Sequence, residues 1–147
     1  MLVDSHCHLD FDSFDEDRSE MIQRAFDAGV GTLVTICTHY SKFEKIAAIA
    51  ELDPRIYCSV GIHPHQVEEE DAINLDDFLQ AAKHPKVIGI GETGLDYFYD
   101  QSPREDQQTS FRTHIAAARE TLLPLIVHTR DADDDMAAIL KEEMQIG

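Results

Sequence analysis

The chain has 147 residues, 43% of them hydrophobic and 28% charged, which is typical of a globular protein of single-domain size. Its formal net charge is −17, from 12 basic and 29 acidic residues, so a broad basic surface that wraps nucleic acid is excluded. No apolar run is long enough to span a membrane, and the first residues lack a signal-peptide pattern. We therefore expect a cytoplasmic protein without membrane partners.

The first predicted strand lies in residues 2–10 (LVDSHCHLD) and carries two histidines one residue apart. Because side chains alternate between the two faces of a strand, His6 and His8 point the same way, where their imidazoles can share one cation. Cys7 points to the other face, so a metal role for it is disfavoured. For this pair alone, two solvent-facing histidines are an equally good interpretation.

The three cysteines, Cys7, Cys37 and Cys58, form an odd set without a C-x-x-C pair. Each lies in an apolar, strand-like run. Buried, reduced thiols are therefore expected, in keeping with a cytoplasmic protein.

Short apolar runs alternate with amphipathic helix patterns along the rest of the chain. This alternation is typical of an α/β fold with a parallel sheet and right-handed crossovers, and no linker divides residues 1–147 into separate domains. The further strands are predicted at residues 32–38, 56–63, 87–92 and 125–128.

Two helix starts carry recognisable caps. Ser41 and Glu44 have the spacing of a capping box before the helix that begins near residue 43. Ser102, Pro103 and Glu105 are predicted as N-cap, N1 proline and N3 acid of a later helix.

Each predicted strand ends in residues that can do chemistry. In parallel α/β sheets and barrels the functional site lies at the carboxyl ends of the strands, so these residues are expected to converge. Imidazole and carboxylate together suit zinc, magnesium or manganese, and a carboxylate on a middle strand can bridge two ions. The residues at these ends are His6 and His8, Thr38 and His39, His63 and His65, Glu92, and His128.

Four segments resemble, in order and spacing, the motifs of TatD-type metal-dependent deoxyribonucleases, which are amidohydrolase-like (β/α)8 barrels. They are LVDSHCHLD, VGIHPHQ, IGIGETGLDY and LPLIVHTRDA. The resemblance implies that His6, His8 and His128 are metal ligands. It also implies that Glu92 is a catalytic acid shared by two divalent ions (Mg, Mn or Zn).

The resemblance places two more residues near the substrate. His63 resembles the family's histidine beside the site, and we assign it a catalytic and substrate-binding role, toward either the phosphate or the attacking water. Arg130 is expected to contact phosphate; an ion pair with an acid near Asp131 is an equally good interpretation.

The chain is shorter than the family pattern. A (β/α)8 barrel needs roughly 250 residues, and family members carry a further histidine ligand on the sixth strand and an aspartate ligand on the eighth. We therefore expect an incomplete barrel of about five β/α units. Its unpaired sheet edges would favour self-association, and little activity is expected from the chain alone.

The leading functional hypothesis is a metal-dependent phosphodiester hydrolase that acts on nucleic acid. The acidic surface favours DNA ends or short single strands over duplex as substrate. One alternative is amide, ester or lactone hydrolysis, although such barrels often place a modified lysine where Glu92 stands. The other is a non-catalytic metal-binding remnant.

Overall fold

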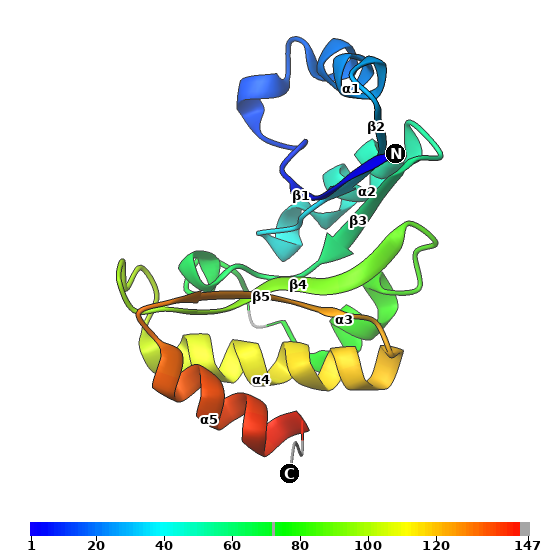
Figure 1. Cartoon of the computed structure of the whole chain (residues 1–147). Coiled ribbons are helices and arrows are strands. Elements are labelled where there is room, and N and C mark those ends of the chain that lie inside the picture. Colours follow the sequence, from blue (N-terminus) through cyan, green and yellow to red (C-terminus); the bar gives the residue numbers. More distant parts are fainter. Residues whose placement is uncertain (72, 145–147) are drawn as a thin grey trace.

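The protein is described from a computed structural model, which describes residues 1–71 and 73–144. Strands and helices alternate along the chain (Figure 1). In chain order they are β1 Leu2–Cys7, η1 Asp12–Phe14, α1 Arg18–Asp27, β2 Val30–Thr35, η2 Tyr40–Lys42, α2 Phe43–Glu51, β3 Ile56–Val60, η3 Pro64–Gln66, α3 Leu75–Ala81, β4 Val87–Asp96, α4 Arg104–Thr121, β5 Leu125–Arg130 and α5 Asp133–Met144.

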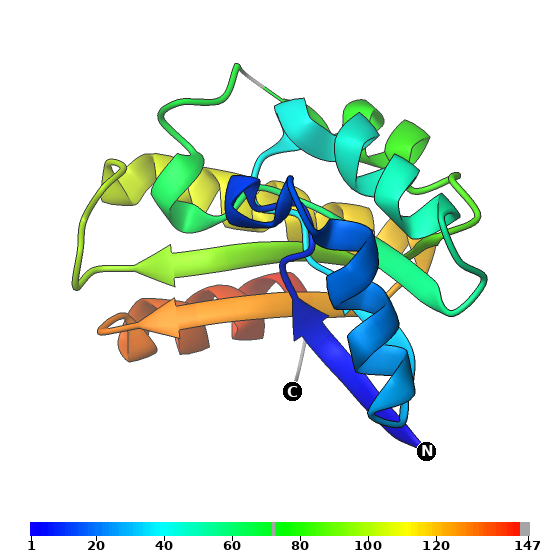
Figure 2. The same cartoon turned by 90° about the horizontal axis from the view of Figure 1, so that it is seen from above.

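The five strands form one parallel sheet whose spatial order, β1-β2-β3-β4-β5, is the order of the sequence. Figure 2 shows β4 and β5 side by side and running in the same direction. In doubly wound sheets the strand order reverses at a switch point, whereas in (β/α)8 barrels each strand pairs with its successor. The structure therefore confirms the predicted α/β fold with five units of a barrel-type parallel sheet.

The helices cover the sheet through two apolar clusters. In the larger one, Ile46 and Ala50 of α2 pack with Ile56 and Cys58 of β3. The smaller one joins the end of β4 to α4 and α5, and its buried residues are Leu95, Phe111, Ile115, Ala132, Met136 and Ile139. Each buried large aliphatic or aromatic side chain contributes roughly 1.5–3 kcal/mol by leaving water. These two clusters fix the strands, and thus the strand ends, relative to one another.

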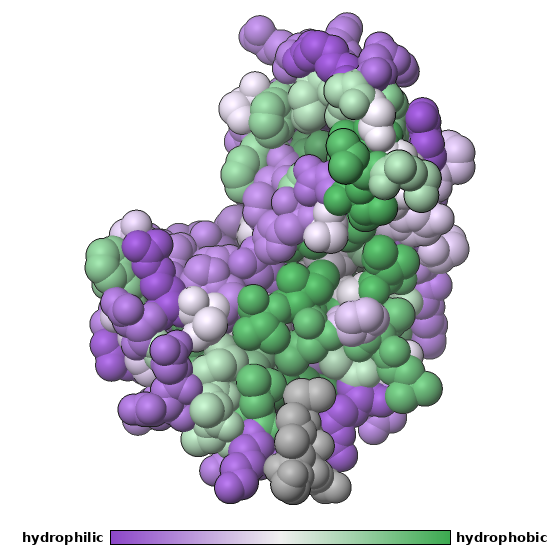
Figure 3. Space-filling model, viewed as in Figure 1, coloured by the Kyte–Doolittle hydropathy of each residue, from purple (hydrophilic) through white to green (hydrophobic). Residues whose placement is uncertain are grey.

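Apolar side chains are exposed on the edge strands. Leu2 and Val3 in β1 and Val127 in β5 are among the exposed large hydrophobic residues. Figure 3 shows apolar side chains gathered in the middle of the face seen there. Such a surface agrees with the expected open sheet edges, and self-association through them stays a prediction. No helix in the described part of the chain is long and apolar enough to cross a membrane.

The predicted capping box at Ser41 is wrong. Ser41 lies inside η2, and α2 begins at Phe43 without a side-chain cap. The Ser41 amide and hydroxyl both donate to the Glu70 carboxylate, at 3.0 and 2.7 Å. Ser41 therefore bonds to Glu70, which is distant in the sequence, and not to the start of α2.

The predicted N-cap at Ser102 is also wrong, because Pro103 occupies the N-cap position of α4. The Ser102 hydroxyl instead donates to the carbonyl oxygen of His65 and accepts from the amide of Glu68. It therefore ties the start of α4 to the segment that carries His63 and His65.

The cysteines are free thiols, as expected. Cys37 and Cys58 are fully buried, while Cys7 is only partly buried and donates to the carbonyl oxygen of Val34 at 3.3 Å. Burial raises the pKa of each of the three thiols to about 12. The thiols are therefore protonated and poor nucleophiles at neutral pH.

Candidate metal centre

The strand ends bring the predicted site residues together. His6 lies in β1, and His8 follows that strand directly. His63 follows β3 as the N-cap of η3, while Glu92 and His128 lie within β4 and β5. These side chains come from four strands, so the site exists only once the sheet has formed.

Glu92 is at the centre of this group and is only 8% exposed. Its Oε2 lies 3.2 Å from His6 Nε2. Its Oε1 lies 3.4 Å from His128 Nδ1 and 3.9 Å from His63 Nε2. The two carboxylate oxygens therefore face different histidines, which is the arrangement expected of an acid that serves two neighbouring cations.

Three groups in the described part of the chain have ligand atoms within 4.8 Å of one another. Nitrogen and oxygen donors of this kind suit zinc, manganese and related divalent ions. Glu92 belongs to two groups and His128 to two, so the groups are contiguous. They are His6, His8 and Glu92; His63, Glu92 and His128; and His65, Asp96 and His128. The donor set fits the metal dependence that the sequence predicts.

His8 is already oriented for such a role. Its Nδ1 lies 3.3 Å from the carbonyl oxygen of Ile36, which can only accept, so Nδ1 carries the proton. The Nε2 lone pair is then free for a cation. A backbone partner of this kind commonly fixes the tautomer and the ring orientation of a ligating histidine.

Asp96 was missed by the sequence reasoning. It is fully buried, and its Oδ2 accepts from His65 Nε2 at 2.7 Å and from His128 Nε2 at 3.0 Å. The available signal was its spacing, because a residue four positions after Glu92 on a strand returns to the same face. Strand β4 was predicted to stop at Glu92, whereas it continues to Asp96.

The electrostatic coupling of these groups sets their protonation. Burial alone would raise the pKa of the Glu92 carboxyl, but the hydrogen bond from His128 and the charges of His63 and His6 outweigh it and hold that pKa below its ordinary value. The Glu92 carboxylate raises the pKa of His128. Burial lowers the pKa of His63 to about 4. At neutral pH, Glu92 is anionic and His63 is neutral.

Arg130 does not form the ion pair that was one of its two interpretations. Within residues 1–71 and 73–144, no carboxylate oxygen lies within 4.0 Å of its guanidinium. Its central carbon lies 4.3 Å from the ring centre of Phe98 and 4.8 Å from that of Tyr99. Asp131 follows with a positive φ of 52°.

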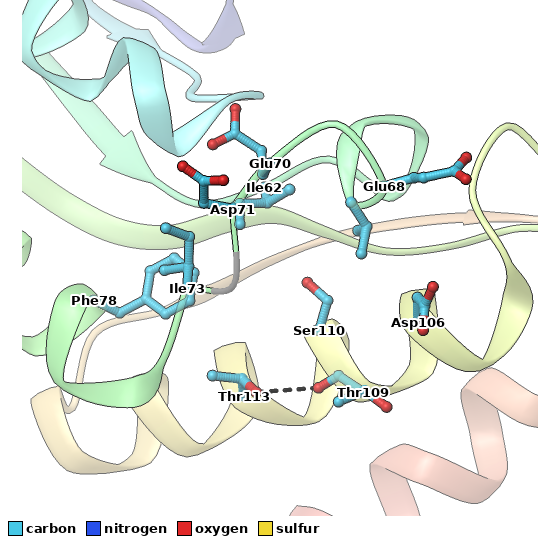
Figure 4. Close-up of a pocket in the computed structure, with 11 residues that line it drawn as sticks. Ile62, Glu68, Glu70, Asp71, Ile73, Phe78, Asp106, Thr109, Ser110 and Thr113 are labelled. Carbon is cyan, nitrogen blue, oxygen red and sulfur yellow. Dashed lines mark hydrogen bonds between the residues drawn. The ribbon is translucent and has the colours of Figure 1, made fainter.

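Two hollows differ in what they offer. One lies at the strand ends and is lined by His6, His8, Phe11, Thr38, His39, His63, His65, Gln66 and Glu92. The other, beside α4 and shown in Figure 4, has a volume of about 380 Å³. Its lining includes Glu68, Glu70 and Asp106 but no histidine. Of these two hollows, the one at the strand ends is the one that the candidate metal ligands line.

Residues 3–147 match the TatD related DNase family, and the chain belongs to that family. Among its relatives, it is 38% identical over 143 residues to the uncharacterized metal-dependent hydrolase YabD of Bacillus subtilis (strain 168), covering 97% of this chain and 56% of YabD. It is 29% identical over 140 residues to the 3'-5' ssDNA/RNA exonuclease TatD of Escherichia fergusonii, covering 95% of this chain and 54% of that protein.

A solved structure supports the same assignment. The crystal structure of YjjV, a TatD homologue from Escherichia coli K12, superposes with a TM-score of 0.88 at 35% identity. The match covers 97% of this chain and 56% of YjjV. The chain thus spans about half the length of the relatives it matches, and its five parallel strands correspond to part of their barrel.

Proposed function

We propose that this protein contributes the histidine–glutamate half of a metal-dependent phosphodiester hydrolase that acts on nucleic acid. The observation that supports this most directly is the Glu92 carboxylate, whose two oxygens face histidines from β1 on one side and from β5 on the other. In this proposal His6, His8, Glu92 and His128 hold two divalent ions. When bound, these ions would supply positive charge at the phosphate and increase the acidity of a water molecule.

His63 is assigned to the substrate phosphate. Its Nδ1 accepts a hydrogen bond from the amide of His65 at 3.1 Å, so the proton of the neutral ring is on Nε2. That nitrogen faces the Glu92 side of the site and can only donate. A donor suits a phosphate oxygen, whereas removing a proton from water would need a free lone pair.

The proposed substrate is a DNA end or a short single strand. The net charge of −17 opposes long electrostatic contact with a duplex, while a site at the strand ends needs only local contact. The relative from Escherichia fergusonii is named as a 3'-5' ssDNA/RNA exonuclease, which supports a single-stranded substrate.

Metal binding tests the ligand set without requiring turnover. Calorimetric titration with Mn²⁺ or Zn²⁺ should show uptake by the wild type and a clear loss in His6→Ala. Cys7→Ala is the matched control, since the thiol lies on the opposite face: it should bind metal normally and lose about 1 kcal/mol of stability. Equal stoichiometry in His6→Ala and wild type would contradict the assignment.

Cleavage tests the reaction. Chelator-sensitive hydrolysis of single-stranded DNA should be abolished by Glu92→Gln, because glutamine keeps the side-chain shape but lacks the charge that holds cations together. Given that the chain spans about half of its relatives, we expect weak turnover from the 147 residues alone. Metal-dependent hydrolysis of an amide or lactone without cleavage of DNA would replace this proposal by the carbonyl alternative.

A further inference from the structure

Three side chains form one cluster, which we call the aromatic ledge: Phe98 and Tyr99, which follow β4, and Arg130, the last residue of β5. The Phe98 and Tyr99 rings are nearly perpendicular, with centres 4.8 Å apart. The Arg130 guanidinium lies over both rings, at 4.3 and 4.8 Å from their centres. The ledge therefore combines two π surfaces with one positive charge.

The packing of the fold does not account for this cluster. Phe98 is 55% exposed and Tyr99 is 51% exposed, so much of each ring still faces water. Neither ring belongs to the two apolar core clusters of the described residues. Arg130 has no carboxylate partner there either, although acidic residues outnumber basic ones by 29 to 12. Exposed aromatic surface with an uncompensated cation is typical of a binding surface.

The ledge is attached to the candidate metal centre through Asp96. Oδ1 of Asp96 accepts from the amides of Phe98 and Tyr99 at 3.2 and 2.9 Å. Oδ2 of the same carboxylate accepts from His65 and His128. The Tyr99 ring also meets the His65 ring edge-on, with centres 5.4 Å apart. One buried group thus sets the position of the ledge relative to the site.

We propose that the aromatic ledge is a nucleobase-binding subsite, an inference that rests on the function proposed above. One unpaired base stacks against the exposed surface of Phe98 and Tyr99 while its strand places a phosphate at the candidate metal centre. Stacking of bases on aromatic rings is sequence-tolerant, and arginine adds a cation–π contribution. A base inside a duplex has no free face, so the ledge selects single strands and frayed ends.

Binding to a hydrolysis-resistant strand tests the ledge separately from turnover. The probe is a short dye-labelled phosphorothioate DNA strand, compared with strands that lack a single base at successive positions, and affinity is read by fluorescence anisotropy. The wild type should lose about tenfold in affinity when the stacked base is absent. Phe98→Leu and Tyr99→Leu keep apolar bulk but remove the flat ring, so they should lose the same factor and no longer distinguish the strands.

Two control variants show whether a loss of affinity comes from the aromatic rings. Tyr99→Phe keeps the ring and should behave as the wild type. Leu52→Ala removes an exposed apolar side chain at the end of α2, before β3 begins, and should have no effect. The circular dichroism spectra of Phe98→Leu and Tyr99→Leu should match the wild type, because replacing an exposed ring should leave the fold unchanged.

The outcomes separate the two proposals. If base removal and the leucine variants leave affinity unchanged while cleavage still requires Glu92, the ledge is wrong and the hydrolase stands. If affinity depends on the base and on the rings but the unmodified single strand is not cut with any metal, the ledge stands and the hydrolase fails. If the protein binds none of the strands, both proposals are wrong.

Discussion

Asp96 connects the protonation of the site histidines to the backbone. It accepts four hydrogen bonds, two from imidazoles and two from main-chain amides. Burial alone would raise the pKa of the Asp96 carboxyl, but these hydrogen bonds outweigh it and lower that pKa to about 2. The carboxylate is anionic at any pH near neutrality, and it holds a proton on the Nε2 atoms of His65 and His128.

We predict that Asp96→Asn weakens metal binding by roughly 10- to 100-fold, as loss of such supporting groups commonly does. Without metal, His128 donates from Nδ1 to Glu92 and from Nε2 to Asp96, and a bound cation would take the place of the Nδ1 proton. The asparagine amide would face the imidazole N–H donors with a donor of its own, so His128 would keep its remaining proton on Nδ1 and could not offer that nitrogen to a cation. Titration calorimetry with Mn²⁺ measures the effect, and NMR of the imidazole nitrogens reads the tautomer. Unchanged metal affinity and an unchanged His128 tautomer would show that Asp96 only accepts hydrogen bonds from the backbone amides and does not support the metal centre.

His114 is a second buried titratable residue, remote from the metal centre. It is fully buried in α4, where its Nε2 accepts from the Ile62 amide at 2.9 Å and its Nδ1 donates to the Ser110 carbonyl at 2.7 Å. Both ring nitrogens are satisfied only when the ring is neutral. Burial accordingly lowers the pKa of His114 from 6.5 to about 4.

This pKa predicts a loss of stability in mild acid. Between about pH 6.5 and pH 4 the unfolded chain binds a proton at His114 that the folded chain excludes, so stability falls as the pH falls through this window, by up to roughly 3 kcal/mol. Urea unfolding at several pH values should show a shallower decline for His114→Gln than for wild type. The comparison cancels the contributions of His63 and His128, which titrate in both proteins. Parallel curves would contradict the prediction.

At the scale of elements, α3 depends on a cap that the sequence reasoning overlooked. Asn74 Oδ1 accepts from the Asp77 amide at 3.2 Å, and Asp77 Oδ2 accepts from the Asn74 amide at 2.9 Å. This reciprocal box satisfies two donors at the start of a helix of only 7 residues. A helix this short is not stable without its cap and its packing.

We predict that Asn74→Ala costs about 1 kcal/mol of unfolding free energy. Ser41→Ala is the matched control, because Ser41 caps no helix and loses one exposed hydrogen bond to Glu70, worth less than about 0.5 kcal/mol. Urea denaturation of both variants measures the difference. Equal losses would mean that the box at Asn74 contributes no more than a surface contact.

At the scale of the whole molecule, charge should set how the protein meets nucleic acid. The net charge is −17, and Arg130 is the cation of the aromatic ledge. Because few Lys or Arg side chains would contact the phosphates, binding of a nucleic-acid strand should release few of the counterions around that strand. Under the proposed function, attraction to a strand is expected only at the strand ends of the sheet, while the acidic remainder of the surface repels it.

We predict a shallow salt dependence. Proteins with 6–10 phosphate contacts lose about 10³- to 10⁵-fold in affinity between roughly 50 and 200 mM salt, whereas this protein should lose less than about tenfold at constant Mn²⁺. Anisotropy titrations of single-stranded DNA across this range provide the slope. A steep slope would indicate a basic track that the described surface does not suggest.

The order of the elements and the residues at the strand ends could be predicted from the sequence. Alternation of apolar runs with helix patterns is a local signal, and the β/α repeat places successive strands side by side. His6 and His8 share a face because strand geometry requires it, and Glu92 and His128 follow from their places at strand ends. The distances between these groups then depend on packing that no single segment encodes.

Only the tertiary structure decided the partners of Ser41, Ser102 and Asp96. Ser41 and Ser102 have sequence neighbours that fit a helix cap, yet each forms its hydrogen bond with a distant segment. The reason is that a polar side chain bonds to whichever partner the packing of the chain brings within reach. Asp96 depends on β4 continuing past Glu92, which pairing with β5 decides. The sequence by itself therefore determined the repeating β/α fold and the kinds of side chain in the site, histidine and carboxylate. The sheet decided which of these side chains meet and how they are oriented, because their contacts join residues from different strands.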